Sequence, residues 1–415
     1  MKKSDSGLDF VEDGGIASPL GFRAAGVCAG LKKSEKDDLA LVFSEHECNF
    51  AGTFTSNLFP AAPVQLCRDR VAAGGTIRAV VVNSGVANAC TGLEGYKNAQ
   101  KTAEAVGAAL HIAPEKVMVS STGRIGVQLP MDKIAAGVTE AAKRLSPKGG
   151  SAAAAAIMTT DTRPKELAVS FQYEGKRVTI GGMTKGAGMI SPKMIVARPH
   201  ATMLCYLTTD AKISNELLAD FLSEAVDSSF NRIVIDNDMS TNDTCLLLAN
   251  GASGVEITDG SGELNRMFRD ALSIVTEHLA RSMVMDGEGA SKFVSVEVSG
   301  ALTDSDAEKC ARAIADSMLC KTAWFGCDPN WGRVLAAAGY SGAVFSPENV
   351  SLDYDEMPVV RGGMDAGTPE EELSSVLKRH EFTIRLDLGE GNACHNIWTS
   401  DLTYEYVKIN ADYHT

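Results

Sequence analysis

The stretch "KGAGMISPKMIVARPHATMLCYLTTDA" runs from Lys185 to Ala211, and the interpretation of the fold depends on it. It begins with a glycine-rich turn and ends in an apolar run headed by Thr202. Apolar and β-branched residues in such a run favour a buried strand. Thr202 is therefore either the first residue of a strand or, if the chain is cut before it, the first residue of a new chain.

The second interpretation of Thr202 has a clear chemical consequence. A free α-amino group has a pKa of about 7.7–8.0, so part of it is neutral at physiological pH. That amine can take the proton of the threonine hydroxyl, directly or through water, and so make the hydroxyl a nucleophile. The preceding residue, Ala201, is small and suits a carbonyl that is attacked at close range. From these residues alone, a strand start remains the simpler interpretation.

Three segments away from this stretch have helical periodicity. Their apolar residues recur at spacings of three and four, and one of them opens with Ser305 and Glu308 at the spacing of a capping box. A run of alanines after two glycines predicts a tightly packed helix. The predicted helices are 131–145, 149–158, 215–226 and 305–318.

Strand patterns alternate with these helices. Residues 292–300 and 381–388 place apolar side chains at every second position, whereas 76–85 is apolar on both faces and predicts a central strand. No internal repeat and no long polar linker is visible. The sequence therefore predicts an α+β fold with at least one sheet covered by helices.

Length and charge narrow the classes of function. The chain has 415 residues, enough for two or three domain-sized units. Its 39 Lys and Arg against 53 Asp and Glu give a net charge of −14, which argues against a nucleic-acid partner. An acidic surface still permits a local basic pocket for an anionic substrate.

The ten cysteines are scattered without a CxxC pair, so we expect reduced cysteines, most of them in the core, and no zinc site. No cofactor is expected. The N-terminal lysines are not followed by the apolar run of a signal peptide, and no segment has the roughly 18 apolar residues of a membrane helix. We therefore expect a cytoplasmic protein without membrane partners.

Two glycine-containing motifs are candidates for binding sites. "SSTGRIG" (Ser120 to Gly126) follows an apolar strand and could aim N–H groups at an oxyanion, although an ordinary turn is the simpler interpretation. "KGAG" is not a phosphate-binding loop, because Gly186 follows Lys185 where Ser or Thr is required. The histidines show neither the HExxH spacing nor a GxSxG motif, so a Ser-His-Asp hydrolase has no support.

Taken together, several motifs resemble one family, the bifunctional ornithine acetyltransferase/N-acetylglutamate synthases of the cyclic arginine pathway. The similarity extends in the same order from about residue 15 to the last residue, which makes it specific. The matching motifs are "NSGVANACTG", "SSTGRIG", "IMTTDTRPK", "TKGAGMISPKM", "ATMLCYLTTDA", "STNDT", "GEGASK", "DPNWGR" and "WTSDLTYEYVKINADYHT".

The resemblance implies a precursor that cleaves itself between Ala201 and Thr202. It also implies an α chain of residues 1–201, a β chain of residues 202–415, and a heterotetramer of two α and two β chains. The implied fold has sheets layered with helices, in the N-terminal-nucleophile style shared with self-processing aminopeptidases. One departure from the family lies beside the cleavage site, where "IVARPH" (Ile195 to His200) is inserted.

The resemblance also assigns site residues. Thr202 corresponds to the nucleophile, and Thr122 and Gly123 to the pair that stabilises the oxyanion. One substrate contact falls on the two threonines of "TTD", where Thr159 is preferred to Thr160. The positions that correspond to substrate contacts are Thr159, Lys185, Thr202, Glu288, Asn410 and Thr415.

The implied reaction moves an acetyl group from N2-acetyl-L-ornithine to L-glutamate through an acetyl–Thr202 ester, in a ping-pong cycle. No motif decides whether acetyl-CoA also serves as a donor. Two alternatives stay open. A self-processing N-terminal-Thr amidohydrolase or aminopeptidase of the same fold would pass the acyl group to water, and a binding protein would keep an uncleaved chain.

Overall fold

A long strand, β3 (Leu39–Phe54), organises the first of the two units into which the chain divides. The computed structural model describes residues 7–191, 203–258 and 261–412. Of these, the second unit contains 232–237 and 284–412, and the first unit contains the others.

The first unit is built on a sheet in which β3 belongs to two layers. Its residues 49–54 pair with β11, and its residues 39–44 pair with β2. The strand order is β1-β6-β7-β8-β11-β3-β4-β5, with β2 beside β3 and a small β9-β12 sheet apart. The strands are β1 (Leu8–Phe10), β2 (Phe22–Val27), β4 (Ile77–Val86), β5 (Val117–Arg124), β6 (Lys165–Tyr173), β7 (Lys176–Lys185), β8 (Leu204–Thr209), β9 (Lys212–Ile213), β11 (Thr244–Ala249) and β12 (Glu256–Ile257).

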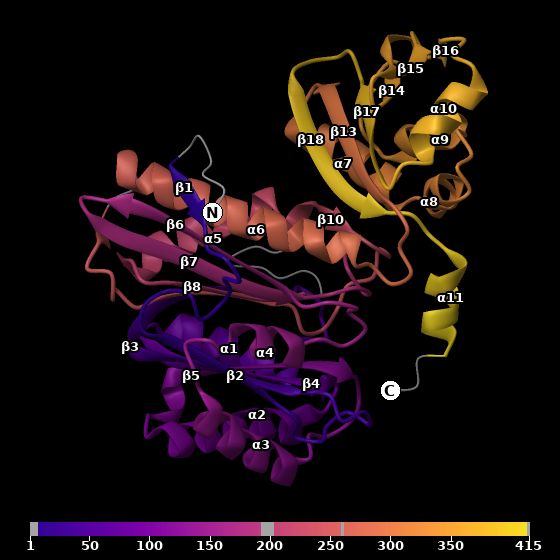
Figure 1. The fold of residues 1–415 in the computed structure, drawn as a ribbon. Helices are drawn as coiled ribbons and strands as arrows, with labels where there is room; N and C mark the ends of the chain where they lie inside the picture. Colours follow the sequence, from indigo (N-terminus) through magenta and orange to yellow (C-terminus); the bar gives the residue numbers. More distant parts are fainter. Residues whose placement is uncertain (1–6, 192–202, 259–260, 413–415) are drawn as a thin grey trace. The chain divides into compact units, whose positions relative to one another are not determined.

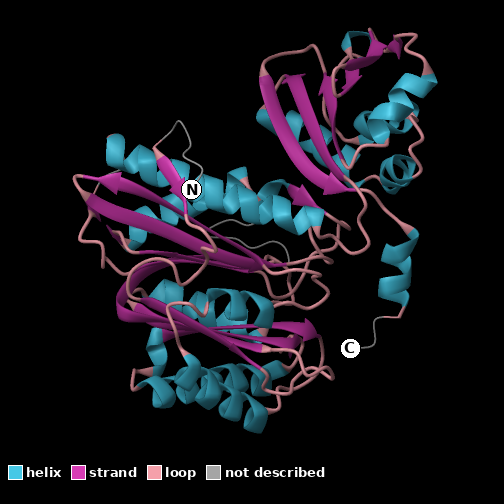
Figure 2. Cartoon of the chain, in the orientation of Figure 1, coloured by secondary structure: helices cyan, strands magenta, loops and turns pink. Residues whose placement is uncertain are grey.

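Helices cover both layers of this unit (Figures 1 and 2). The layer of β6, β7 and β8 is separated from the layer of β2, β4 and β5 by α1 and α4, while α2 and α3 cover the outer face of the second layer. The helix α6 packs on β7, where Val275 and Leu279 lie against Gly182. The helices are α1 (Ala62–Ala73), α2 (Gly92–Leu110), α3 (Met131–Arg144), α4 (Gly150–Ala156), α5 (Asn215–Ser228) and α6 (Glu263–Met285).

The apolar run of β4 explains its central place. Val80 and Val82 belong to the core between the layers, whereas Ala79 and Val81 belong to the core under α2 and α3. Both faces of the strand are therefore buried, and it lies between β3 and β5, which confirms the predicted central strand. The α+β class with layered sheets is confirmed.

The alanine-rich helix α4 is also confirmed, and its small side chains allow a close approach to β2. A Cβ at Gly149, just before the helix, would lie 1.8 Å from the carbonyl oxygen of Ala24. The helix thus needs glycine at its start as much as alanine in its body.

The second unit contains its own seven-stranded sheet, in the order β10-β18-β13-β17-β14-β15-β16. The two predicted strands are its centre, since β13 and β17 pair in parallel and bury their alternate apolar residues. Its elements are β10 (Ile233–Val234), β13 (Phe293–Ala301), β14 (Ser351–Tyr354), β15 (Met357–Arg361), β16 (Met364–Asp365), β17 (Glu381–Asp387), β18 (Ala393–Ser400), α7 (Asp304–Asp316), α8 (Met318–Phe325), α9 (Trp331–Tyr340), α10 (Glu370–Leu377) and α11 (Tyr404–Ala411).

The predicted cap of α7 is wrong by two residues. Thr303, not Ser305, precedes the helix, and its hydroxyl accepts a hydrogen bond from the backbone N–H of Asp306. The same hydroxyl donates to the Asp306 carboxylate at 2.7 Å, and Thr303 takes the N-cap role that Ser305 was expected to fill.

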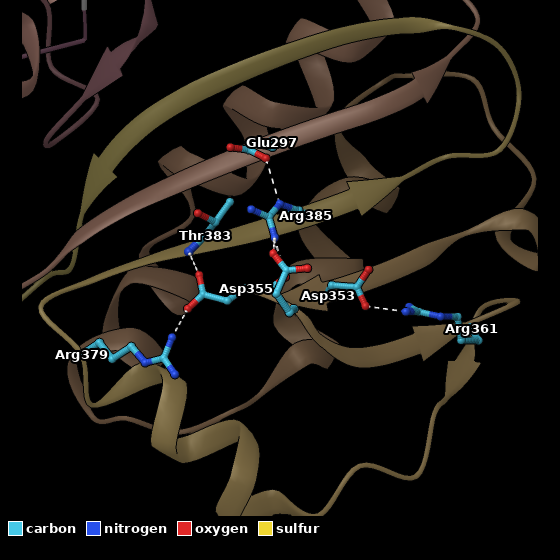
Figure 3. Close-up of polar contacts among 8 residues, drawn as sticks. Glu297, Asp353, Asp355, Arg361, Arg379, Thr383 and Arg385 are labelled. Atoms are coloured by element: carbon cyan, nitrogen blue, oxygen red, sulfur yellow. Dashed lines mark hydrogen bonds and ion pairs between the residues drawn. The ribbon is translucent and has the colours of Figure 1, made fainter. Parts of the chain in front are cut away.

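One polar network lies on the exposed side of this second sheet (Figure 3). Arg385 on β17 pairs with Glu297 on β13 at 3.1 Å, and Asp355 accepts from the N–H of Thr383 and from Arg379. Exposed pairs of this kind each contribute at most about 1 kcal/mol to stability. The network therefore orders the surface of the sheet and has no catalytic geometry.

All ten cysteines are free. Six of them are buried, as expected, but Cys28, Cys90 and Cys394 are exposed. None of the helices in the described part of the chain has both the length and the apolar character that crossing a membrane requires.

Candidate active site

The end of β5 carries Thr122 and Gly123, the pair expected to stabilise an oxyanion. The simpler interpretation of "SSTGRIG" as a turn is wrong for Ser120 to Arg124, which belong to β5, and a turn follows only at Ile125 and Gly126. Residues 120–123 add to the parallel ladder with β4, so hydrogen bonding between the strands overrides the local turn tendency.

Gly123 has a backbone conformation that other residues rarely adopt. Its φ is +124°, and a Cβ there would lie 2.3 Å from the carbonyl carbon of Gly85 on β4. The ladder is irregular at this point, with Val86 opposite both Thr122 and Arg124. Such a bulge turns the backbone out of the regular ladder, which is how an N–H group is re-aimed beside an active site.

Lys185, the last residue of β7, connects the predicted site residues of the first unit. It is only 4% exposed, and its Nζ lies 2.8 Å from the hydroxyl of Thr159 and 3.5 Å from the hydroxyl of Thr122. These three residues are far apart in the sequence and come together here. Of the two threonines in "TTD", Thr159 is the one whose hydroxyl contacts Lys185.

Asp161 contacts the residues of this cluster, although no role for it is predicted from the sequence. Its buried carboxylate accepts hydrogen bonds from the Nζ of Lys165 at 2.7 Å, from the N–H of Gly186 at 2.7 Å and from the N–H of Thr159 at 3.0 Å. Asp161 therefore fixes the backbone at Thr159 and directly after Lys185. In the sequence, the position of Asp161 between these threonines and Lys165 in "TTDTRPK" could have indicated a supporting role.

The local charge is positive although the chain as a whole is acidic. Burial would raise the pKa of Asp161, but the ammonium groups of Lys185 and Lys165 and the hydrogen bonds lower it to about 2. Lys32 is close enough to feel both Asp161 and Lys185, and burial lowers its pKa. Lys32 also faces Asp38, so the ammonium groups of Lys32, Lys165 and Lys185 lie near the carboxylates of Asp38 and Asp161, and this excess of positive charge suits an anionic substrate.

Replacing Asp161 with asparagine should destabilise the protein by about 2–3 kcal/mol, the value that corresponds to its pKa shift, because two buried lysines lose their counter-charge. Folding lowers the pKa of Asp161 from 3.8 to about 2. This stabilisation is therefore complete above about pH 4 and is lost as the pH falls towards 2. Urea unfolding at pH 7 measures the loss. The exposed Asp132→Asn is the control, and equal urea midpoints for both variants would contradict the assignment.

The start of β8 completes this side of the unit. Leu204 pairs with Lys185 on one side and with Thr244 on the other, and Met203 just before it is buried. Thr202 and Ala201, the predicted nucleophile and cleavage position, lie outside the described residues, as does the 195–200 insertion. Because β7 and β8 are neighbours in one sheet, the predicted α and β chains would both contribute strands to the first unit.

Two further predicted contacts lie in the second unit and meet there. The amide Nδ2 of Asn410, on α11, donates to the carboxylate of Glu288 at 2.7 Å. Glu288 is 9% exposed and follows α6 closely. Thr415 lies outside the described residues. The structure thus brings together Thr122, Thr159 and Lys185 in one unit and Glu288 and Asn410 in the other.

Comparison with known proteins gives a consistent result. The ArgJ family model matches residues 23–415. The "Arginine biosynthesis bifunctional protein ArgJ" of Symbiobacterium thermophilum is 49% identical over 405 residues, which cover 97% of this chain and 99% of the relative. The "Glutamate N-acetyltransferase" of Methanocaldococcus jannaschii is 45% identical, covering 98% of this chain and 100% of the relative.

Among solved structures, that of the arginine biosynthesis bifunctional protein ArgJ from Bacillus halodurans is 37% identical, with a TM-score of 0.43. The match covers 45% of this chain and 97% of that chain. The sequence relatives and the family model, which covers nearly the whole chain, establish the relationship. The chain therefore belongs to the ArgJ family of arginine-biosynthesis acyltransferases.

Proposed function

We propose that this chain transfers the acetyl group of N2-acetyl-L-ornithine to L-glutamate through an acetyl ester on Thr202. The name of the Methanocaldococcus jannaschii relative supports glutamate as the acceptor. The observation that carries the proposal is the contact of Lys185 with Thr122 and Thr159. This contact places a buried ammonium group beside two hydroxyl groups, one of which belongs to the residue directly before the bulged Gly123. Lys185 also pairs with the first residue of β8, which follows Thr202 by two residues in the sequence.

The proposed roles follow from these side chains. Attack on the acetyl carbonyl builds negative charge on its oxygen, which the Thr122 hydroxyl and the Gly123 N–H stabilise. Lys185, with Lys32 nearby, attracts the substrate carboxylate. Ornithine then leaves, and glutamate takes the acetyl group from the ester. Glu288, Asn410 and Thr415 are proposed as further substrate contacts on the basis of the family resemblance.

The proposal includes processing and assembly. The precursor cleaves itself between Ala201 and Thr202, and two α chains of residues 1–201 assemble with two β chains of residues 202–415. The reaction needs no cofactor, since the amine of Thr202 supplies the base and the ester carries the acetyl group. With acetyl-CoA as a second donor, the same ester on Thr202 would form and CoA would leave in place of ornithine.

One assay separates this function from hydrolysis. Purified protein is incubated with N-acetylornithine, with and without glutamate, and ornithine, acetate and N-acetylglutamate are measured. We expect ornithine release to depend on glutamate beyond the first turnover and to match N-acetylglutamate formation. Continuous release of acetate without glutamate would instead identify an amidohydrolase of the same architecture.

A further inference from the structure

Lys32 places a second ammonium group near the oxyanion pair. Its side chain is half-buried, and a Cβ at Gly85 on β4 would lie 3.3 Å from the Lys32 Cγ, so the stem of Lys32 packs against Gly85. Gly85 in turn touches Gly123, whose Cβ would lie 2.3 Å from the Gly85 carbonyl carbon. One glycine therefore separates the stem of Lys32 from the bulge that carries the proposed oxyanion donor.

The loop that carries Lys32 is bound to β4. The buried carboxylate of Asp38 accepts hydrogen bonds from the N–H groups of Ala29 and Leu31, both at 2.6 Å. It also accepts from the N–H of Lys32 at 3.0 Å. The carbonyl of Asp38 accepts from the N–H of Ser84 on β4 at 2.8 Å. Because Asp38 links the loop to the strand, the backbone of Lys32 has a defined place beside the site.

The ammonium group of Lys32 keeps hydrogen-bond donors for a ligand. Its Nζ donates to the backbone carbonyl of Asp37 at 2.9 Å, which uses one of three N–H groups. Among the residues that the structure describes, no carboxylate forms an ion pair with it. The two nearby buried carboxylates are bonded to other groups, since Asp38 accepts from backbone N–H groups and Asp161 from Lys165.

The charges around Lys32 favour a ligand with two carboxylates. Burial lowers the pKa of Lys32, and the carboxylates of Asp38 and Asp161 oppose this. The ammonium groups of Lys185 and Lys36 repel it and lower the pKa further. A dianion that reaches both Lys32 and Lys185 relieves this repulsion. Glutamate has two carboxylates, whereas N-acetylornithine has one carboxylate and a cationic side chain, so this pair of lysines matches glutamate better.

We propose that Lys32 is a specificity residue that binds the γ-carboxylate of the acceptor glutamate, while Lys185 binds its α-carboxylate. This inference rests on the proposed function, in which glutamate takes the acetyl group. The role of Lys32 involves no bond making and no proton transfer, only a charge-assisted hydrogen bond to the substrate. Glutamine has the same length but a neutral amide in place of the γ-carboxylate, so Lys32 should favour glutamate over glutamine as acceptor.

The test is Lys32→Met, which keeps the apolar stem against Gly85 and removes the ammonium group. In a ping-pong cycle, kcat/KM for each substrate reports its own half-reaction. We expect kcat/KM for glutamate to fall about 10–100-fold, as for the loss of a hydrogen bond between charged groups, with kcat/KM for N-acetylornithine within about twofold. The preference for glutamate over glutamine should fall by a similar factor, because the variant no longer distinguishes a carboxylate from an amide.

Lys33→Met is the matched control, because it removes the same charge from the exposed neighbouring position of the same loop. Its kcat/KM values for both substrates and its preference for glutamate should equal those of the wild type. If Lys32→Met and Lys33→Met weaken the use of glutamate equally, long-range attraction explains the effect and the proposed contact is wrong.

Three other results for Lys32→Met would overturn the inference: an unchanged kcat/KM for glutamate, equal losses for both substrates, or a loss for glutamate without a change in its preference over glutamine. Transfer by the wild type is measured alongside. A wild type that does not acetylate glutamate refutes the proposed function itself. A normal wild type with an unaffected Lys32→Met variant refutes only the role of Lys32.

Discussion

Thr202→Ala should abolish both cleavage of the chain and acetyl transfer. Alanine has no hydroxyl to attack the Ala201 carbonyl, so the precursor stays whole and the amine is never released. Even a cut chain would lack the oxygen that carries the acetyl group. We expect kcat to fall below detection, measured as N-acetylglutamate formed, while electrophoresis shows a single full-length band.

Thr202→Ser is the matched control, because serine keeps both the hydroxyl and, after cleavage, the amine. It should be cut and should retain measurable turnover, with both reduced by the changed side-chain packing. A full-length Thr202→Ala protein that transfers acetyl groups at the normal rate would rule out the mechanism. So would an inactive serine variant that is normally cleaved, since the same two groups are then present.

Gly123→Ala should reduce kcat by about 10²–10³, the usual cost of losing one oxyanion donor. The backbone at Gly123 has a φ of +124°, and the new Cβ would lie 2.3 Å from the carbonyl carbon of Gly85. The bulge must therefore shift, and the N–H moves with it. Steady-state kinetics with N-acetylornithine and glutamate measures the change, and KM should change far less than kcat.

Gly126→Ala controls for backbone strain in the same motif. Its φ is also positive, at +81°, but a Cβ there meets nothing within 4 Å. The control should lose stability and keep most of its activity. If both variants lose the same activity, strain in the loop explains the loss and the role of Gly123 as an oxyanion donor is wrong.

Periodicity predicted the regular elements well. The apolar spacing in α3 and α5 and the alternation in β13 and β17 reflect one buried face each, which a sequence records directly. Capping and turn motifs predicted where helices and strands begin and end less well. Thr303 displaced Ser305 as the cap of α7, and pairing with β4 extended β5 through a segment whose residues favour a turn.

The site residues that matched a family motif were predicted, and those that support them were not. Asp161 stands in the matching motif "IMTTDTRPK", yet nothing local in the sequence shows that its carboxylate has three hydrogen-bond donors. Lys32 comes near Lys185 only because the sheet assembles them. Such contacts depend on strand order, which periodicity does not specify.

Denaturing mass spectrometry of the purified wild-type protein tests the central claim most directly. Denaturation is essential, because β7 and β8 on either side of the cleavage position are neighbours in one sheet and would hold the fragments together. The account predicts two species, residues 1–201 and residues 202–415, the second with Thr202 as its first residue. A single species of 43.8 kDa in a preparation that transfers acetyl groups would contradict it.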